Sequence, residues 1–408
     1  IDKFTRHVGW SHPGGPKVET HAREGEYVDL PYVVKGMDFS FSGIMSAAKQ
    51  EYDSGTRVED VCRGLEETIF AMLTEVSERA LSLTGRDELV LGGGVAQNER
   101  LQGMLREMCD QRGASLHVPE NRLLRDNAGM IAVLGAKMAA AGDTLAIEDS
   151  AIDSDFRPDD VAVTWRSRDP DPARVSSNPN GPTANGTTAN GTTANGPTAN
   201  GPTANGPTVE FQGAEATVTI DGDEVVKRRN PRSYRHPALD ERLRRERTRI
   251  EARLTSEARR QGVPTPLVRD VDTGSTAITL QRVGDCDLDG SLTAEHVRAV
   301  GRHLATIHDA GFVHGDPTTR NVRVETGNSG ADSDSGRVFL IDFGLGYHTG
   351  HEEDHAMDLH VFAQSLAGTA DDADALQAAA EAAYRETSER ADTVLDRLRA
   401  IEGRGRYQ

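Results

Sequence analysis

Two short stretches decide the fold of the second half of the chain: "HGDPTTRN", residues 314–321, and "LIDFG", residues 340–344. The first places Asp316 five positions before Asn321, and the second places Asp342 directly before Phe-Gly. Carboxylate and amide oxygens are hard ligands that suit Mg²⁺. We therefore interpret Asp316 as the catalytic residue that orients the attacking oxygen in phosphoryl transfer. Asn321 and Asp342 are interpreted as ligands of a nucleotide-bound Mg²⁺.

Further parts of such a site precede these residues in the expected order. Lys227 follows a strand-like apolar run and is placed to bind the α- and β-phosphates of ATP. Glu251, on a charged helix expected over 238–261, is placed to hold Lys227. Gly213 is a third candidate ATP-binding residue, in a stretch with one glycine where ordinary protein kinases have three.

The segment after "LIDFG" narrows the class of kinase. Helix-like "EEDHAMDLHVFAQSL" (352–366) begins eight residues after Gly344, with no Ala-Pro-Glu and no room for a regulated activation segment. The surface that usually docks a peptide substrate is therefore missing. A small-molecule kinase usually carries a helical insert for its acceptor, and none is evident. The pattern favours an ATPase in kinase form, with a signalling protein kinase as the alternative.

A repeat separates this kinase-like part from the first half. Residues 180–208 repeat Asn, Gly, Thr, Ala and Thr or Pro, with no apolar side chain larger than Ala. Such a segment buries too little surface to offset its ordering entropy. We predict a disordered linker over 167–208, with a root-mean-square span of about 35 Å. It would join a first domain over 1–166 to a second over 209–408, each long enough to hold a core.

The first domain is expected to be a layered α/β domain. Apolar residues at helical spacing predict a helix over 58–84 that stops at Gly85. "ELVLGGGVAQNERLQGMLREMCDQRG" (88–113) predicts a short strand, a glycine turn and an amphipathic helix, and "SLHVP" (115–119) predicts the next strand. Apolar "DNAGMIAVLGAKMAAAG" (126–142) predicts a further, buried helix.

The second domain shows strands followed by helices, an α+β order that suits a two-lobed kinase fold. Strand-like "ATVTI" and "EVVKRR" flank "DGD" at 221–223, which is a hairpin signal. "TAITLQRV" (276–283) predicts a strand, and "TAEHVRAVGRHLATIHDAG" (293–311) predicts a helix with a glycine stop.

The sequence carries no signal for a membrane or for export. There is no run of about 18 apolar residues and no charged-then-apolar leader. The three cysteines lie far apart without metal-type spacing, which fits a reducing compartment. We expect a cytoplasmic protein without a membrane or DNA partner.

Residues 209–408 resemble the small atypical kinase of the archaeal and eukaryotic KEOPS complex, which is related to RIO kinases. The resemblance rests on "GAEA", "HGDPTTRN", "IDFGLG", "EEDHAMDLHVF", the basic stretch from Lys227 and the terminal "GRGRY". It implies a domain that acts mainly as an ATPase in support of tRNA modification. Pro317 and Arg320 depart from the family's usual loop, but the Asp and Asn that carry the chemistry are kept.

The charge distribution agrees with a tRNA partner. The chain has a net charge of −19, which we interpret as an acidic coat suited to high salt, where repulsion is screened. Residues 227–260 nevertheless hold 13 Lys or Arg against 5 Asp or Glu, a local balance of +8. A charged helix face is often simply solvated. Beside an ATP site, and with Arg404 and Arg406 in the tail, this one favours contact with tRNA phosphates.

The first domain resembles a second family, the threonylcarbamoyl-adenosine synthases, which are the catalytic subunits of the same complex. The likeness spans 1–166 and implies a partial actin-like ATPase lobe. That family transfers a threonylcarbamoyl group from its adenylate to adenosine 37 of tRNAs. The motifs that carry the likeness are "DKFTRHVGWSHPGGPKVE" (2–19), "LPYVVKGMDFSFSG" (30–43), "GGGVAQN" (92–98) and "DNAGMI" (126–131).

The resemblance implies roles for particular residues. Asp126 would be one ligand of Fe²⁺ or Zn²⁺, although a carboxylate at the start of a helix also suits a cap. Glycines without side chains would let an adenosine group approach the backbone closely. The residues implied to bind threonylcarbamoyl adenylate are Asp2, Gly15, Glu19, Gly93, Gly94 and Asn98.

One departure concerns the transferase metal. The family's paired metal-binding His residues, separated by three positions, lie upstream of where this sequence starts. His7, His12 and His21 do not reproduce that spacing. A catalytic metal generally takes about three protein ligands. We therefore expect the chain as given to be deficient in threonylcarbamoyl transfer.

Together the two resemblances predict a bifunctional tRNA-modifying protein of the KEOPS complex. Its partners would be tRNA, other KEOPS subunits, ATP and threonylcarbamoyl adenylate, with Mg²⁺ accompanying ATP. The kinase half would hydrolyse ATP to support modification of tRNAs that read codons beginning with A. Two alternatives stay open: an atypical serine/threonine protein kinase with a degenerate, non-catalytic adaptor domain, and a non-catalytic assembly scaffold.

Overall fold

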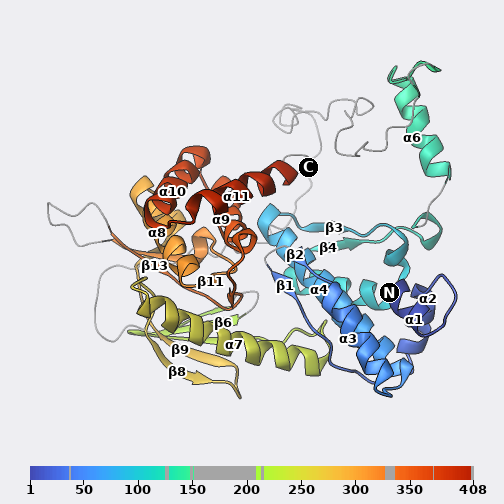
Figure 1. Ribbon diagram of the computed structural model, residues 1–408, viewed down its shortest axis with the longest axis horizontal. Coiled ribbons are helices and arrows are strands. Elements are labelled where there is room, and N and C mark those ends of the chain that lie inside the picture. The colour runs from blue at the N-terminus through green and yellow to red at the C-terminus, as the bar shows by residue number, and fades with distance from the viewer. Residues whose placement is uncertain are drawn as a thin grey trace, which may run out of the picture.

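The computed structural model describes residues 1–35, 38–124, 128–147, 150, 208–212, 216–326, 336–370 and 372–405. The predicted linker lies outside the described residues except for Thr208, and so do two predicted site residues, Asp126 and Gly213. Figure 1 shows the first half of the chain beside the second. No helix within the described ranges is long and apolar enough to pass through a membrane.

The first half is built around one long helix, α4 (Val58–Thr84). Acidic residues lie in its first turn, where they favour the positive end of the helix dipole. Gly85 ends the helix with a φ of +61°, in the left-handed region that favours glycine. The predicted helix and its stop are therefore confirmed. Leu65 and Met72 of α4 are fully buried in the core of this half.

A parallel strand pair forms the sheet that follows α4. The strands β3 (Glu88–Val90) and β4 (Ser115–His117) pair in register, with Leu89 opposite Leu116. Parallel strands need a crossover connection, and here α5 (Glu99–Arg112) supplies it. The predicted order of strand, glycine turn, helix and strand is confirmed.

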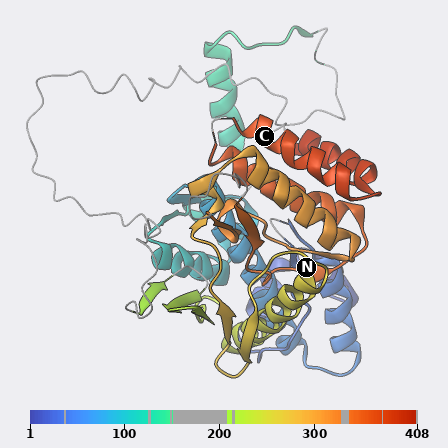
Figure 2. The same cartoon turned by 90° about the vertical axis from the view of Figure 1, so that its left-hand side faces the viewer.

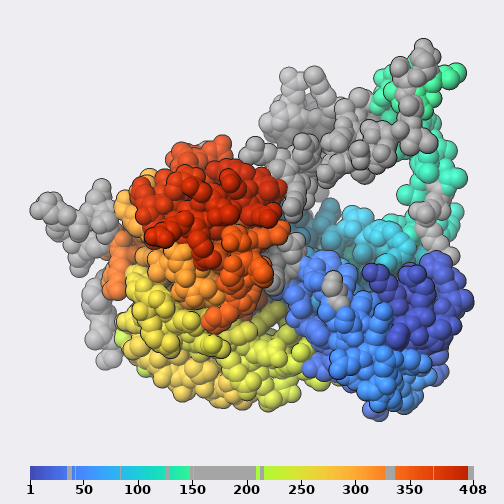
Figure 3. Space-filling model, viewed as in Figure 1, coloured from blue at the N-terminus to red at the C-terminus, as the bar shows by residue number. Residues whose placement is uncertain are grey.

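The next helix, α6 (Ala128–Ala140), forms as predicted, but the prediction that it is buried is wrong. Ile131 is 75% exposed and Met130 is 54% exposed. Figures 1 and 3 show α6 standing away from the rest of the first half. None of the apolar clusters formed by the described residues includes a residue of α6. Its apolar side chains therefore have no apolar surface in the described ranges to pack against.

The second half opens with an antiparallel sheet. Its hairpin joins β6 (Ala216–Asp221) to β7 (Glu224–Arg229), and Gly222 at the turn has a φ of +57°. The helix α7 (Pro237–Arg260) packs on this sheet, as predicted for a kinase-like first lobe. The sheet has the strand order β5 (Val209–Gln212), β6, β7, β9 (Ala277–Gln281), β8 (Val268–Asp272).

Helices dominate the rest of the second half. The helices α8 (Ala294–Asp309) and α10 (Ala373–Thr387) pack backbone to backbone. A Cβ added at Gly301 would lie only 2.3 Å from the carbonyl oxygen of Ala380, so glycine is required at that contact. Figure 2 shows these helices side by side, in orange and red.

The remaining helices and strands complete both halves. In the first half these are α1 (Asp2–His7), α2 (Gly15–Ala22), β1 (Val34–Lys35), β2 (Asp38–Phe39), α3 (Ser42–Asp53), η1 (Gly94–Gln97) and η2 (Asn121–Leu123). In the second half they are β10 (Cys286–Asp287), η6 (Leu288–Ser291), β11 (Phe312–Val313), η7 (Thr319–Asn321), β12 (Val322–Glu325), β13 (Arg337–Leu340), β14 (Tyr347–His348), α9 (Glu352–Ala367) and α11 (Ala391–Gly405).

The two halves contact each other directly (Figure 3). Tyr234, just before α7, is fully buried and belongs to the core of the first half. Its carbonyl oxygen accepts a hydrogen bond from Arg100 of α5 at 3.1 Å. Leu239 and Leu243 of α7 pack against Ala71 of α4. The start of α7 is therefore part of both halves.

Candidate functional site

Lys227 lies at the centre of the predicted ATP site. Its Nζ is 2.9 Å from Oε1 of Glu251 and 2.6 Å from Oδ1 of Asp342. The strand β7 supplies Lys227, the helix α7 supplies Glu251, and the loop after β13 supplies Asp342. Three residues that the sequence places far apart thus converge as predicted.

The electrostatics of this cluster favour its charged forms. Burial opposes the charge of Lys227, but Asp342 and then Glu251 outweigh it and raise the Lys227 pKa. Burial likewise opposes ionisation of Asp342, but Lys227 and then Arg229 outweigh it and lower the Asp342 pKa. The charged forms of Lys227 and Asp342 therefore stabilise each other, although the Asp342 side chain is 38% exposed.

Arg229 is a member of this cluster that the sequence reasoning missed. It is 5% exposed, and its Nη2 lies 2.5 Å from Oε2 of Glu251. The two oxygens of Glu251 are therefore divided between Lys227 and Arg229. The available signal was the alternation in "EVVKRR", since residues 227 and 229 face the same side of a strand.

The backbone around Asp342 is built for this position. Asp342 has a φ of +64°, an uncommon conformation for a residue with a side chain, which persists only where the surroundings hold it. A Cβ at Gly344 would lie 2.0 Å from Nη2 of Arg229. Glycine is thus needed so that Arg229 can reach Glu251 beneath the loop.

The loop that carries Asp316 and Asn321 (residues 314–321) is held by hydrogen bonds between these two residues. Nδ2 of Asn321 donates to the carbonyl oxygen of Asp316 at 2.8 Å and to Oδ2 of Asp316 at 2.9 Å. The backbone N–H of Ile341 donates to the carbonyl oxygen of Asn321 at 3.0 Å, so Asn321 lies beside the segment that carries Asp342. The sequence prediction placed Asp316, Asn321 and Asp342 in one site, and the structure brings them together.

Asp358, on α9, anchors this loop and was also missed. Its carboxylate accepts the backbone N–H groups of His314 at 2.6 Å and of Gly315 at 2.8 Å. The same carboxylate lies 3.1 Å from Nε2 of His308, whose other ring nitrogen is 2.9 Å from the Tyr384 hydroxyl. An Asp inside an apolar helical run was the available signal, because a buried carboxylate needs partners.

In the first half, four of the six predicted adenylate-binding residues form two groups. Oδ1 of Asp2 accepts the backbone N–H of Gly14 at 2.9 Å, next to Gly15 at the start of α2. A Cβ at Gly14 would lie 2.2 Å from Oγ1 of Thr5, so the chain approaches closely at this point. Asp2 thus lies next to the turn that leads into Gly15, and its predicted role in binding the adenylate stays a prediction.

The second group joins α2 to α5. Asn98 caps α5, with Oδ1 accepting the N–H of Leu101 at 3.0 Å. Its Nδ2 donates to Oε1 of Glu66 at 2.9 Å, a buried residue that the sequence reasoning missed. Burial and the nearby Glu19 raise the pKa of Glu66, although Asn98 acts against the shift. Glu19 and Asn98 therefore lie in one carboxylate-rich region.

Gly93 and Gly94 lie in the turn before α5. Gly93 has a φ of +86°, and no atom lies within 4 Å of a Cβ built at either glycine. Both are exposed, so the turn offers backbone to a ligand. Among the described residues, no hydrogen bond joins these two glycines to Asp2 or Glu19.

Comparison with known proteins identifies both halves. The family described as tRNA N6-adenosine threonylcarbamoyltransferase matches residues 1–133, and the lipopolysaccharide kinase (Kdo/WaaP) family matches residues 267–384. A probable bifunctional tRNA threonylcarbamoyladenosine biosynthesis protein of Haloarcula marismortui is 67% identical over the whole chain, which covers 68% of that relative. The chain belongs to the bifunctional tRNA threonylcarbamoyladenosine biosynthesis proteins. This membership favours the bifunctional reading over a protein kinase with a degenerate adaptor.

Other members of this family also match the whole chain, at similar or lower identity. The relative from Halobacterium salinarum is 66% identical, and the chain covers 69% of it. The relative from Methanospirillum hungatei is 41% identical, and the chain covers 70% of it. Among solved structures, the Rio2 kinase from Chaetomium thermophilum matches with a TM-score of 0.31 and 18% identity. That match covers 49% of this chain and 71% of the Rio2 chain, and it is too distant to bear on function.

Membership in this family implies metal use in both halves, and the described residues fit the two metals differently. In the kinase-like half, Asn321 and Asp342 offer the oxygen donors that Mg²⁺ takes. In the transferase half, no group of three His, Cys, Asp or Glu within the described ranges is arranged to hold a metal. Asp126, the predicted ligand, lies outside those ranges.

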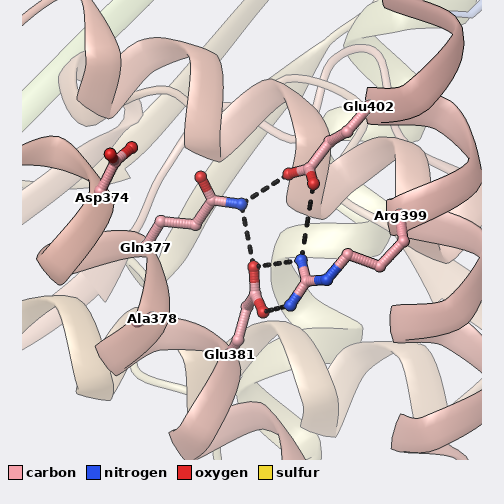
Figure 4. A pocket seen from close by; sticks show the side chains of 6 residues that line it. All are labelled: Asp374, Gln377, Ala378, Glu381, Arg399 and Glu402. Carbon is pink, nitrogen blue, oxygen red and sulfur yellow. Dashed lines mark hydrogen bonds and ion pairs between the residues drawn. The ribbon is translucent and has the colours of Figure 1, made fainter. Parts of the chain in front are cut away.

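A cavity of about 200 Å³ lies between α10 and α11, away from these residues (Figure 4). Its polar side chains bond mainly to each other: Gln377 donates to Glu381 at 2.9 Å and to Glu402 at 2.6 Å. Arg399 pairs with both of these glutamates. The cavity contains none of the predicted site residues, and its network serves to join two helices.

Proposed function

We propose that the chain acts within the KEOPS complex in threonylcarbamoyl transfer to N6 of adenosine 37, in tRNAs that read codons beginning with A. The kinase-like half would hydrolyse ATP to support this modification. Membership in the family supports the tRNA modification, and the convergence of Lys227, Glu251 and Asp342 supports the use of ATP. That convergence is the observation on which the proposal depends.

The arrangement suggests how ATP is held. Lys227, kept in place by Glu251, provides a fixed positive charge for the α- and β-phosphates. Asn321 and Asp342 would hold Mg²⁺, which neutralises charge on the phosphate oxygens when bound. Asp316, oriented by the amide of Asn321, would orient the attacking water.

Hydrolysis rather than protein phosphorylation fits the connection after the site. Only seven residues separate Gly344 from Glu352 at the start of α9. The short strand β14 occupies part of this connection by pairing with β11. Little chain remains to form a platform for a peptide acceptor.

In the first half, Asp2, Gly15, Glu19, Gly93, Gly94 and Asn98 are proposed to bind threonylcarbamoyl adenylate. Asp2 and Glu19 present acceptors for ribose or amide donors, and the exposed backbone at Gly93 leaves room for an adenosine group. The transferase metal, Fe²⁺ or Zn²⁺, would need ligands in addition to Asp126.

The proposed setting is the cytoplasm, where tRNA is modified. Cys62, Cys109 and Cys286 are free thiols, as expected in a reducing compartment. The proposed partners are tRNA and the other subunits of the complex.

The test is ATP hydrolysis by the purified chain with Mg²⁺, with and without tRNA. Asp342→Asn and Asp316→Ala should each lower the rate about 100-fold, since each removes a group that acts on the phosphates or the water. Asp374→Asn, at the cavity between α10 and α11, is the matched control and should hydrolyse ATP like the parent. Equal rates in all four proteins would refute the proposed ATPase.

A further inference from the structure

The helix α7 connects the two halves of the molecule physically. It carries Glu251, which holds Lys227 in the ATP site. One turn earlier it carries Arg247, which contacts the first half through Glu75 of α4. Figure 1 shows α7 passing from beneath the kinase-like half to the edge of the transferase half. A displacement of α7 at one end therefore moves a residue of the ATP site at the other.

Glu75 is the centre of the contact. It is 1% exposed, and each of its carboxylate oxygens has two donors. Oε1 lies 2.5 Å from Nη2 of Arg79 and 2.6 Å from Nη2 of Arg247, whereas Oε2 accepts the Tyr32 hydroxyl at 2.5 Å and lies 2.6 Å from Nη2 of Arg235. Two of these donors come from the first half and two from the second. One buried carboxylate thus ties the halves together.

Apolar contacts also hold α7 against the first half. Leu239 and Leu243, on the same part of α7, pack against Ala71 of α4 and against Tyr32. Arg242 donates to the carbonyl oxygen of Leu30 at 3.1 Å. The first half therefore contacts α7 from Leu239 to Arg247, through ion pairs, a hydrogen bond and apolar packing.

We propose that Glu75 of the transferase half is a positioning residue for the ATP site of the kinase-like half. It fixes α7 through Arg247, and α7 in turn presents Glu251 to Lys227. The inference rests on the proposed ATPase and adds that its nucleotide affinity depends on a residue in the other half. It also explains why a buried carboxylate and several arginines occupy an interface that apolar side chains could fill.

The physical consequence of losing this charge follows from the geometry. A neutral amide at residue 75 removes the negative charge that Arg79, Arg235 and Arg247 share, although Arg235 still lies 3.6 Å from Asp240. Their repulsion pushes α7 away from α4 and loosens the contact of Glu251 with Lys227. ATP should then bind more weakly, while Asp316 and Asp342 still act on whatever nucleotide is bound.

The experiment compares Glu75→Gln with Glu78→Gln in the full chain, by the dependence of hydrolysis rate on ATP concentration. Glu78 is also buried on α4 and also pairs across the interface, but with Arg232, which precedes α7. Glu75→Gln should raise the KM for ATP about fivefold or more, with kcat changed less than KM. Glu78→Gln should leave the KM within twofold of the parent. Thermal unfolding followed by circular dichroism reports whether each variant is folded.

A second comparison tests the route through Glu251. In a Glu251→Gln background, adding Glu75→Gln should raise the KM no further, because the group that it positions is already gone. If Glu75→Gln does not fold, Arg247→Gln, which removes only the donor on α7, takes its place with the same expected rise. An unchanged KM in a folded variant, or fully additive effects with Glu251→Gln, overturns the inference. Loss of the Asp342→Asn effect would instead overturn the ATPase itself.

Discussion

At the scale of single residues, the predicted ATP site is a set of opposite charges that pair with one another. Glu251 is shared by Lys227 and Arg229, and Asp342 also pairs with Lys227. Removal of one partner from such a set leaves an uncompensated buried charge, which typically costs about 3–5 kcal/mol. In the proposed ATPase, nucleotide and Mg²⁺ would replace the pair between Lys227 and Asp342, while the pair of Arg229 with Glu251 would stay in place.

Buried histidines give the kinase-like half a defined response to acid. Burial lowers the pKa of His303 to about 4, where its Nε2 lies 3.2 Å from the carbonyl oxygen of Val338. Burial, and then the stacked His308, lower the pKa of His355 to about 4. Unfolded histidine titrates near pH 6.5, so between these values the unfolded chain binds more protons than the folded one.

We therefore expect the free energy of unfolding to decrease as pH falls from about 6.5 toward 4. The measurement is chemical unfolding at several pH values in this window. His303→Gln, which cannot take up the proton, should show a shallower decrease than the parent. The same slope in parent and variant would contradict the assignment to His303.

At the scale of elements, α7 performs different tasks on different faces. Its inner face packs on the sheet and on α4, and its outer face exposes arginines at helical spacing. Arg249, Arg253 and Arg260 are exposed and lie on one side of the helix, at intervals of four and seven residues. This stripe is one exposed part of the +8 segment that could contact tRNA phosphates, whereas Arg229, Arg232 and Arg235 are buried in ion pairs.

Replacing Arg249 and Arg253 together by Gln should weaken tRNA binding and make it less dependent on salt. Each phosphate contact that is lost should reduce the slope of log K against log salt by about one. The measurement is a titration of labelled tRNA at several KCl concentrations. Gln at Arg245, which is paired with Glu241 at 2.5 Å, provides the control, with a smaller expected change. Identical slopes in all proteins would place the tRNA elsewhere.

Sequence reasoning predicted the local elements well because their signals are local. The helix before Gly85, the hairpin at residues 221–223 and the grouping around Asp316 each follow from spacing within a few residues. The contact of Glu75 with Arg235 and Arg247 was not predicted, because it joins residues 160 and 172 positions apart. Arg229 was overlooked because Glu251, its ion-pair partner, had already been assigned to Lys227.

At the scale of the whole molecule, the acidic surface predicts a dependence on salt. The chain has a net charge of −19, while the buried charges described above are paired. The remaining exposed acidic groups repel one another over a Debye length of about 10 Å in 0.1 M salt, but only about 3 Å in 1 M salt. The compact state therefore suffers from self-repulsion at low ionic strength.

The midpoint of thermal unfolding should accordingly rise when KCl is increased from 0.1 M to 1 M. Sucrose at equal osmolality, which does not screen charge, is the control and should raise the midpoint less. If the midpoint does not change with KCl, repulsion between the exposed acidic groups does not limit the stability of the folded chain.

The four donors around Glu75 also constrain how the gene can change over time. A substitution at position 75 removes one ion-pair partner from three arginines at once, and a substitution at 247 or 235 removes one partner from the carboxylate. None of these positions is free to drift by itself, so mutations there are tolerated only in combination. We therefore expect related proteins to keep Glu75 and its arginines together. Where one of them is replaced, we expect the others to be replaced as well, by side chains that form an apolar contact.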